Sequence, residues 1–355
     1  MFPRDSPDDL ADATGPEAIG GLLAEAYGIT ARLERIPVGQ ATINYRAETE
    51  RGALFIKAYP AGTDLAAQET GIRMSAIAAN AGVPVARPLR LPGGQFVAAH
   101  RGSAASVWQY VEGRVVDTRY RPPQLQAVGS ALGMIHRAFA ELPASRGPAP
   151  QARAWLAFDA GRFAAMIDRL LGAIAAKDRF DDFDRLAAET LLERRAQAGR
   201  IPGLIAALPA LSTQLVHGDF STVNILMDAD RVAAVVDFSP PDPFFTAYEV
   251  GRIAFNPRAV LASPDFTHDA ATLIDAYRQA NPDAPPDAIA CSARVALIQL
   301  LTSLYGVKQH YLRPGILQAD LDQFWLQRHQ AATRLLKALP DIEDSLPEGL
   351  AWRRT

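Results

Sequence analysis

The stretch that decides the fold is HGDFSTVNIL, residues 217–226, which is followed by VVDF, residues 235–238. Asn224 lies five residues after Asp219, and Asp237 lies 18 residues after Asp219. Two apolar runs joined by the turn DADR separate Asn224 from Asp237, and this pattern predicts a β-hairpin. Because a hairpin brings its two ends together, we expect Asn224 and Asp237 to be neighbours.

An amide oxygen beside a carboxylate is a pair of hard ligands. Such oxygens suit Mg²⁺, which takes few protein ligands and completes its shell with water and phosphate. Asp219 would then be free to accept a proton. The alternative is a polar turn that satisfies itself by Asx hydrogen bonds, which is the ordinary interpretation of one such residue. Three of them around one hairpin favour the metal site.

The composition is that of a globular protein without a basic surface. Of the 355 residues, 49% are hydrophobic and 21% are charged, which suffices for a sizeable core. The net charge of −3 and the absence of a Lys/Arg-rich run argue against a nucleic-acid partner. The single cysteine, Cys291, cannot form an intramolecular disulfide and is interpreted as a core thiol. The stretch MFPRDSPDDL is unlike a secretion signal, and the apolar run 295–307 is too short for a bilayer, so we expect a cytoplasmic protein with no membrane partner.

Strand patterns dominate the first third of the chain. After a flexible tail over residues 1–16, the patterns predict two helices, at 17–27 and 64–82. They predict strands at 31–38, 43–49, 53–59, 94–99 and 106–113. Since the connections are short, we expect an antiparallel sheet with one helix against it.

Helical spacing dominates after Gly113. It predicts helices at 122–142, 153–176, 182–199, 268–280, 286–312 and 317–338. The sequence therefore predicts an α+β protein with a small N-lobe (17–108), a hinge (109–113) and a larger helical C-lobe (114–355). A cleft between two lobes is a common place for a ligand.

Lys57 is the candidate cation of the N-lobe. The chain has 4 lysines against 32 arginines, so a Lys in the apolar run ALFIKAY suggests a compact charge for phosphate. Glu69 in the following helix is the expected ion-pair partner. The alternative is a lysine that protects a sheet edge. The loop VGQATINY, residues 38–45, could offer backbone N–H groups to phosphates, although an ordinary hairpin loop is its default interpretation.

In these motifs the chain resembles the aminoglycoside phosphotransferase and choline kinase superfamily, which has the bilobal protein-kinase-like fold. HGDFSTVNIL resembles the catalytic loop of that superfamily, and VVDF resembles its second metal-binding segment. LGMIHRAF, residues 132–139, resembles the preceding helix, in which His136 is interpreted as a core histidine. The N-lobe runs GQATINYRAET and AGVPVARPL resemble homoserine-kinase-like members.

The resemblance implies a kinase that uses ATP and Mg²⁺ and transfers phosphate to a hydroxyl. It implies that Asp219 orients or deprotonates the acceptor and that Asn224 and Asp237 hold the metal. The residues that it assigns to the nucleotide are Gly39, Thr42 and Asn44 in the loop, Lys57 held by Glu69, and the backbone of Gln109, Tyr110 and Val111 at the adenine. Phosphoryl transfer needs mainly positioning and charge neutralisation, which this set supplies.

The acceptor is less well specified. The resemblance places its pocket between the catalytic loop and the C-terminal helices, with Asp242, Glu249, Arg252, Tyr305, His310, Tyr311 and Trp325 as candidate lining groups. Acidic and aromatic groups there favour a cationic acceptor, although ordinary packing is the alternative for each residue alone. Glu249 also stands where many relatives carry an Asp in a Tyr-Asp-Leu-Ala-like segment, a position interpreted as structural.

We therefore expect a small-molecule kinase, monomeric or homodimeric, whose acceptor is an antibiotic such as an aminoglycoside, or an amino-alcohol or homoserine-like metabolite. Two other functions stay open. A protein kinase is disfavoured because no activation segment with an APE-like end follows Asp237. A nucleotide-binding scaffold without catalysis is disfavoured by the complete set of Asp219, Asn224 and Asp237.

Overall fold

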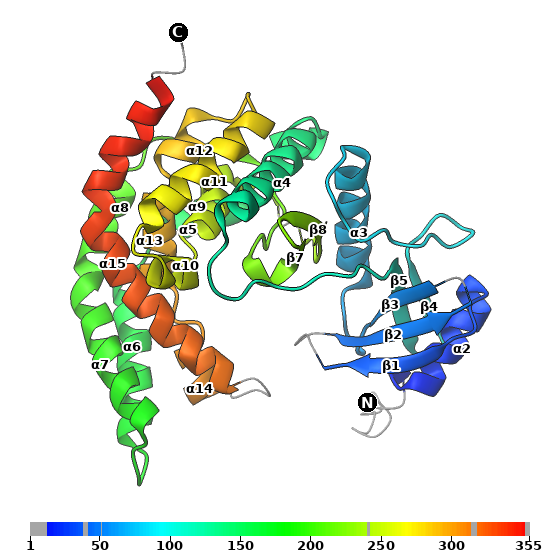
Figure 1. The fold of residues 1–355 in the computed structure, drawn as a ribbon. Coiled ribbons are helices and arrows are strands. Elements are labelled where there is room, and N and C mark those ends of the chain that lie inside the picture. Colours follow the sequence, from blue (N-terminus) through cyan, green and yellow to red (C-terminus); the bar gives the residue numbers. More distant parts are fainter. Residues whose placement is uncertain (1–12, 38–41, 51, 240–241, 314–317, 352–355) are drawn as a thin grey trace. The chain divides into compact units, whose positions relative to one another are not determined.

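The structure is a computed structural model that describes residues 13–37, 42–50, 52–239, 242–313 and 318–351 (Figure 1). The chain forms two compact units. The first contains the described residues up to Arg114, together with Leu226–Asp228 and residues 232–239. The second contains Val115–Ile225, Ala229–Arg231 and the described residues from 242 onward. Most of the predicted hairpin therefore belongs to the first unit, together with the residues that follow it up to 239, although the chain that leads into it belongs to the second.

The first unit is built on one antiparallel sheet. Its elements are α2 (Pro16–Tyr27), β1 (Arg32–Ile36), β2 (Ile43–Thr49), β3 (Gly52–Ala58), α3 (Leu65–Asn80), β4 (Val97–His100) and β5 (Ser103–Gln109). The strand order is β1-β2-β3-β5-β4 (Figure 1), and every neighbouring pair is antiparallel. The last predicted strand ends at Gln109 rather than at 113, so residues 110–113 of the segment expected as a hinge are outside the sheet.

Alternation along β3 decides where Lys57 lies. Ile56 and Ala58 are fully buried and share a hydrophobic cluster with Ile19 and Leu23 of α2. Because successive side chains of a strand point to opposite faces, Lys57 lies on the face away from this cluster. The α2 side of the sheet is thus its packing side, and the other side carries the candidate cation.

The predicted hairpin exists as β7 (Ile225–Asp228) and β8 (Arg231–Val235), which pair with each other. Within the first unit, Met227 and Arg114 exchange two backbone hydrogen bonds of 2.9 and 3.0 Å. The N–H of Val235 donates to the carbonyl of Pro84 at 2.8 Å. These bonds fix the hairpin strands to the chain segments around residues 84 and 114.

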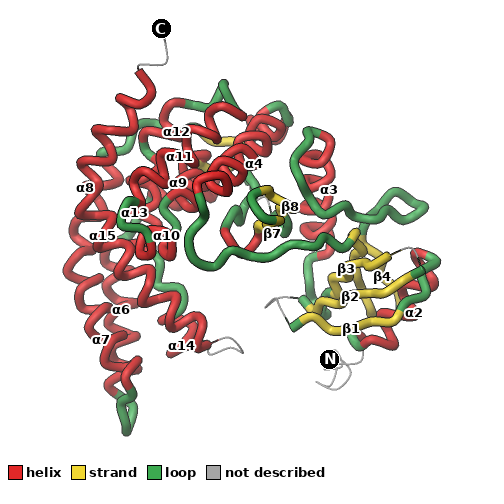
Figure 2. The backbone as a smooth tube through the Cα atoms, viewed as in Figure 1, coloured by secondary structure: helices red, strands yellow, loops and turns green. Residues whose placement is uncertain are grey.

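The second unit is mainly helical (Figure 2). Its elements are α4 (Pro122–Ala140), η1 (Pro143–Arg146), α5 (Pro150–Leu156), α6 (Ala160–Ala175), α7 (Asp182–Gln197), η2 (Ala198–Arg200), α8 (Ile201–Ala206), β6 (Thr213–Gln214), η3 (Thr222–Asn224), β9 (Phe244–Phe245), α9 (Thr246–Ala254), α10 (Pro257–Ala262), α11 (Phe266–Ala280), α12 (Pro286–Ala290), α13 (Ser292–Thr302), α14 (Val307–Leu312) and α15 (Gln318–Ala351). The small antiparallel sheet and the helical remainder confirm the predicted α+β class.

Some helix boundaries were predicted wrongly. The segment 286–312 is three helices rather than one, because the chain leaves helical geometry after Thr302 and Gly306 takes a φ of 93°. The segment 153–176 is also interrupted, between α5 and α6. Helix α9 was not predicted, and α15 continues to Ala351, beyond the predicted end at 338.

Two helix packings position the residues discussed below. Helix α4 packs against α11, with the ring of His136 edge-on to Tyr277. Helix α9 packs against α13 at Gly251, where a Cβ atom would lie 2.2 Å from the carbonyl oxygen of Ser292. The close approach of α9 to α13 therefore requires glycine. Within the described part of the chain, a helix with the length and apolarity of a membrane span is absent.

Candidate functional site

The stretch 217–226 folds as a loop between β6 and β7. It is anchored by apolar side chains, since Val216 and Phe220 are buried and Ile225 is fully buried at the start of β7. The short helix η3 ends at Asn224, directly before that strand. Burial of the flanking apolar residues leaves Asp219 on the exposed side, with 39% of its side chain accessible.

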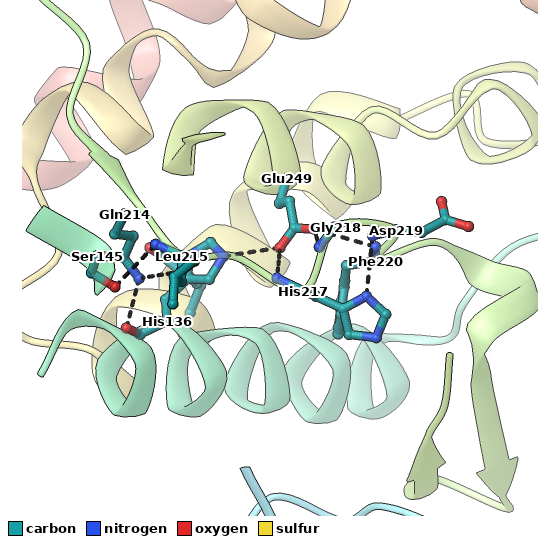
Figure 3. A network of polar contacts seen from close by, with 10 residues as sticks. His136, Ser145, Gln214, Leu215, His217, Gly218, Asp219, Phe220 and Glu249 are labelled. Carbon is teal, nitrogen blue, oxygen red and sulfur yellow. Dashed lines mark hydrogen bonds and ion pairs between the residues drawn. The ribbon is translucent and has the colours of Figure 1, made fainter. Parts of the chain in front are cut away.

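The loop is held by one carboxylate, that of Glu249 on α9 (Figure 3). Its two oxygens accept the backbone N–H groups of His217 at 2.9 Å and Gly218 at 2.7 Å, and a longer bond of 3.4 Å from Phe220. Nε2 of His136 on α4 also lies 3.1 Å from Glu249. A carboxylate that accepts several N–H groups fixes the backbone of the loop at the point where Asp219 emerges.

The surroundings keep Glu249 ionised. Burial favours the neutral carboxyl, but the bonds from His136 and from the loop outweigh it, so the pKa of Glu249 lies below its ordinary value. With an ionised Glu249, Nε2 of His136 must carry a proton. Its Nδ1 lies 3.0 Å from the hydroxyl of Tyr277, so both ring nitrogens have partners. His136 is therefore the core histidine that the sequence predicted.

Glu249 corrects one expectation. It was a candidate for contact with the acceptor, but only 1% of the residue is exposed and both carboxylate oxygens are occupied by the loop. It acts on the loop backbone and does not face a substrate. The sequence signal for this role was its place in AYEVGRIAF, where the resemblance suggested a structural residue.

The side chain of Asp219 contacts Arg252 and Asn224, which both belong to the second unit. Its carboxylate points away from Glu249 (Figure 3) and forms an ion pair with Arg252 of α9. The amide nitrogen of Asn224 donates to Oδ2 of Asp219 at 3.0 Å and to its backbone oxygen at 2.9 Å. With the amide nitrogen of Asn224 directed at Asp219, its carbonyl Oδ1 is the atom that could face a cation.

Lys57 and Asp237 form an ion pair within the first unit. Nζ of Lys57 lies 2.6 Å from Oδ1 of Asp237, and 51% of the Asp237 side chain is exposed. Asp237 has a φ of 64°, a left-handed conformation that is uncommon outside glycine and that is often found at functional sites. Next to it, a Cβ atom on Gly71 of α3 would lie 2.2 Å from the carbonyl oxygen of Phe238, so α3 approaches this backbone closely.

The expected pair of Lys57 with Glu69 is not formed. Oε2 of Glu69 accepts the backbone N–H groups of Phe96 at 2.9 Å and Val97 at 3.0 Å, and its Oε1 lies 3.0 Å from Arg73. Glu69 therefore connects α3 to the start of β4, and the carboxylate beside Lys57 is that of Asp237.

The other candidates for the nucleotide lie in the first unit. Gly39 falls outside the described residues. The hydroxyl of Thr42 donates to Oδ1 of Asn44 at 3.1 Å. The N–H groups of Gln109 and Tyr110 already donate to the carbonyls of Arg87 and Ala53, at 2.8 and 3.2 Å.

The candidates for the acceptor divide into exposed and packed residues. Asp242 is exposed, and Tyr305 is 41% exposed. Tyr311 instead donates to Asp184 at 2.8 Å, which belongs to the packing of α14 against α7. His310 pairs with Asp322, and Trp325 is fully buried. Among these candidates, Arg252 is joined to Asp219 by an ion pair.

Sequence reasoning missed several polar residues of the second unit near Arg252. Tyr248 lies four residues before Arg252 and so occupies the same face of α9. Its hydroxyl accepts a hydrogen bond of 2.8 Å from Gln299 of α13. Arg328 of α15 was not singled out because nothing in the sequence connects it to residues far from it along the chain.

The chain matches the model of one protein family, described as the phosphotransferase enzyme family, over residues 32–288. Two curated relatives are both homoserine kinases. That of Methylobacillus flagellatus is 23% identical over 298 residues, which is 83% of this chain and 78% of the relative. That of Afipia carboxidovorans is 26% identical over 298 residues, which is 83% of this chain and 82% of the relative.

Solved structures share the fold. An aminoglycoside phosphotransferase from Alicyclobacillus acidocaldarius superposes with a TM-score of 0.62 at 15% identity, over 97% of this chain and 98% of that one. A spectinomycin phosphotransferase, in complex with ADP and spectinomycin, superposes with a TM-score of 0.64 at 14% identity, over 90% and 98%. These matches confirm the protein-kinase-like fold that the resemblance implied.

Proposed function

Because the chain belongs to the phosphotransferase enzyme family, we propose that it is an ATP- and Mg²⁺-dependent kinase that transfers the γ-phosphate to a hydroxyl of a small molecule. The observation that carries the proposal is the loop of the second unit. Three backbone N–H groups of the loop donate to one buried carboxylate, which His136 also contacts, and the loop presents Asp219 with Asn224 bound to it. A turn with a purely structural role does not require its backbone to be fixed so firmly around one exposed carboxylate.

Asp219 is the residue that receives the acceptor hydroxyl in this proposal. Its carboxylate accepts from Asn224 and pairs with Arg252, which leaves it oriented and partly exposed. Phosphoryl transfer has a loose transition state, so the protein contributes chiefly by positioning the acceptor and by stabilising charge. Asp219 orients the hydroxyl and takes its proton as the bond to phosphorus forms.

Asn224 and Asp237 fit a magnesium site by their chemistry. They flank one hairpin, one directly before β7 and the other two residues after β8, and each offers a hard oxygen. The left-handed backbone at Asp237 and the fixed amide nitrogen of Asn224 are features expected of ligands whose oxygens are held in place. When bound, the ion would neutralise charge on the phosphates of the nucleotide.

Lys57 is the proposed cation for the phosphates. It is 20% exposed in its side chain and is paired with Asp237 at 2.6 Å, so it lies beside a proposed metal ligand rather than beside Glu69. A point charge on a β-strand, held by a carboxylate, is suited to an anionic group such as a nucleotide phosphate. The backbone around Val111 is the proposed place for adenine.

The acceptor of this proposal is a small hydroxylated compound, either an antibiotic such as an aminoglycoside or an amino-alcohol or homoserine-like metabolite. The homoserine kinases among the relatives support a homoserine-like acceptor, and the aminoglycoside and spectinomycin phosphotransferases among the similar structures support an antibiotic. The test measures ATP consumption with Mg²⁺ across aminoglycosides, other hydroxylated antibiotics, homoserine, choline, ethanolamine and sugars. We expect one acceptor class to raise turnover in the wild type and not in Asp219→Ala. ATP binding without transfer to any acceptor would favour the nucleotide-binding scaffold, and transfer to protein side chains alone would favour a protein kinase.

A further inference from the structure

Three arginines of the second unit, Arg252, Arg328 and Arg194, are related by charge and by hydrogen bonding, and one of them contacts Asp219. Arg252 of α9 pairs with Asp219. Arg328 of α15 and Arg252 both act electrostatically on the phenol of Tyr248: burial raises its pKa, and these two charges oppose the rise. Arg194 of α7 donates to the backbone oxygen of Arg328 at 3.4 Å. The group therefore extends from the candidate catalytic carboxylate into the helical core.

Arg328 lacks an acidic partner among the residues that the structure describes. Its guanidinium lies over the ring of Phe324 at 5.1 Å, and its Nε is buried without a hydrogen bond. Burial, reinforced by the like charge of Arg252, lowers the pKa of Arg328 to about 10. A half-buried cation that faces another cation costs free energy until an anion compensates it.

Arg194 supports the position of Arg328. Only 1% of Arg194 is exposed, and its guanidinium donates to the carbonyl of Leu300 at 2.7 Å and lies 5.4 Å from the centre of the Trp325 ring. These contacts fix the backbone of α15 at residue 328. Burial, together with the like charge of Arg328, lowers the pKa of Arg194 to about 9, so Arg194 adds positive charge and no compensation.

The acidic residues nearby are already committed. Both oxygens of Glu249 accept the backbone N–H groups of the loop, and Asp219 is paired with Arg252. Glu193 pairs with His329 at 2.8 Å, and 61% of its side chain is exposed to solvent. Positive charge therefore exceeds negative charge among Asp219, Arg252 and Arg328.

We propose that the acceptor carries a carboxylate as well as its hydroxyl, and that Arg328, together with Arg252, binds that carboxylate. The inference rests on the proposed kinase function and specifies its substrate class. It reverses the expectation of a purely cationic acceptor, because a ligand ammonium group would meet Arg252 and Arg328 there. The planar fork of a guanidinium matches a carboxylate in geometry, and the carboxylate supplies the counterion that Arg328 lacks.

The test uses three probes that differ only at the carboxyl group. L-homoserine has the carboxylate, homoserinamide replaces it by a neutral amide, and 3-aminopropan-1-ol lacks it. Charge-assisted hydrogen bonds predict that kcat/KM of the wild type is roughly 10- to 100-fold higher for homoserine than for either neutral probe. The same comparison is made for glycerate against glyceramide, and sugar monophosphates are included as phosphate-bearing acceptors.

Variants assign the preference to Arg328. In Arg328→Met we expect KM for the hydroxy acid to rise about 10- to 100-fold with a smaller change in kcat, and KM for the amide to stay within about twofold. Arg328→Lys keeps the charge and should recover part of the loss. The control is Arg195→Met, which removes an arginine of α7 that pairs with Asp168 on the surface. Circular dichroism and thermal melting verify that each variant is folded.

The outcomes separate this inference from the proposed function. Equal turnover of acids and amides, or an acid preference that Arg328→Met leaves unchanged, would overturn the carboxylate site and leave the kinase standing. A preference for sugar monophosphates would overturn the carboxylate assignment in favour of phosphate. If no acceptor is phosphorylated, the proposed function fails, and thermal shifts with the same probes then test the carboxylate site by binding alone. Stabilisation of the wild type by the acid but not by the amide, lost in Arg328→Met, supports the carboxylate site. Equal thermal shifts with acid and amide overturn the carboxylate site.

Discussion

Replacing Glu249 by glutamine should destabilise the protein and slow transfer, because one carboxylate serves several donors. The N–H groups of His217 and Gly218 donate to different oxygens of Glu249, at 2.9 and 2.7 Å. A glutamine has one carbonyl oxygen, so at least one of these N–H groups would face an NH₂ group. His136 can change tautomer to accept from that NH₂ group, but a backbone N–H cannot.

The magnitude follows from the hydrogen bonds. A bond to an ionised group contributes about 1.5–3 kcal/mol, and a buried donor left unpaired costs a similar amount. For Glu249→Gln we therefore expect the free energy of unfolding to fall by about 2–4 kcal/mol. Displacement of the loop that carries Asp219 should also lower kcat by on the order of 10²-fold, since small errors in position are costly in transfer reactions.

Urea unfolding and steady-state kinetics, run side by side, measure both effects. Glu343→Gln is the matched control, because Glu343 is more exposed and pairs with Arg294 away from the loop. We expect it to change stability by less than about 1 kcal/mol and to leave kcat unchanged. Glu249→Asp keeps the charge and should retain part of the stability. Wild-type stability and kcat in Glu249→Gln would refute the role given to this carboxylate.

The same variant has a defined pH dependence. The pKa of Glu249 is lowered in the folded protein from its ordinary value of 4.5, so the ionised carboxylate stabilises the fold above that pH. The contribution is lost as the pH falls through the lowered pKa. The stability difference between wild type and Glu249→Gln should therefore be largest near neutral pH and should shrink in acid. A difference that grows in acid would contradict the assignment of charge.

Three further variants test separate contacts. Lys57→Met should raise KM for ATP and lower kcat by on the order of 10²-fold. The free energy of unfolding should change by less than about 1 kcal/mol, because the pair of Lys57 with Asp237 is partly exposed. Unchanged KM and kcat would show that Lys57 does not bind the phosphates. Gly71→Ala should lower the melting temperature and the activity, because its Cβ would lie 2.2 Å from the carbonyl of Phe238; a wild-type melting curve would show that α3 can move away. Arg252→Met should alter the pH profile of kcat, because it removes the cation paired with the proposed base, and an unchanged profile would mean that the pair does not persist during turnover.

The local parts of the site could be predicted from the sequence. The hairpin β7–β8 follows from two apolar runs around DADR, whereas the hydrogen bond of Asn224 to Asp219 was not predicted. The antiparallel sheet follows from short strands and short connections. Such features depend on residues close together in the chain, where periodicity and turn chemistry are informative.

The pairings between distant residues could not be predicted in the same way. Lys57 pairs with a carboxylate 180 residues away, and a nearer one, Glu69, looked suitable in sequence but is bonded to the start of β4. The burial of Glu249 depends on the packing of α9, which was not predicted as a helix. The charge of Arg252 acts on Arg328, which is 76 residues further along the chain, and no local pattern of the sequence links the two.

The most direct test of the account follows the transferred phosphate itself. Wild type and Asp219→Asn are incubated with ATP, Mg²⁺ and an acceptor that raises turnover, and phosphorus NMR records the products, with nucleotide binding measured on both proteins. The account predicts a phosphomonoester of the acceptor with the wild type, and none with Asp219→Asn although it folds and binds ATP. The same phosphomonoester, formed at the same rate by both proteins, would contradict the role of Asp219 and with it the proposed site.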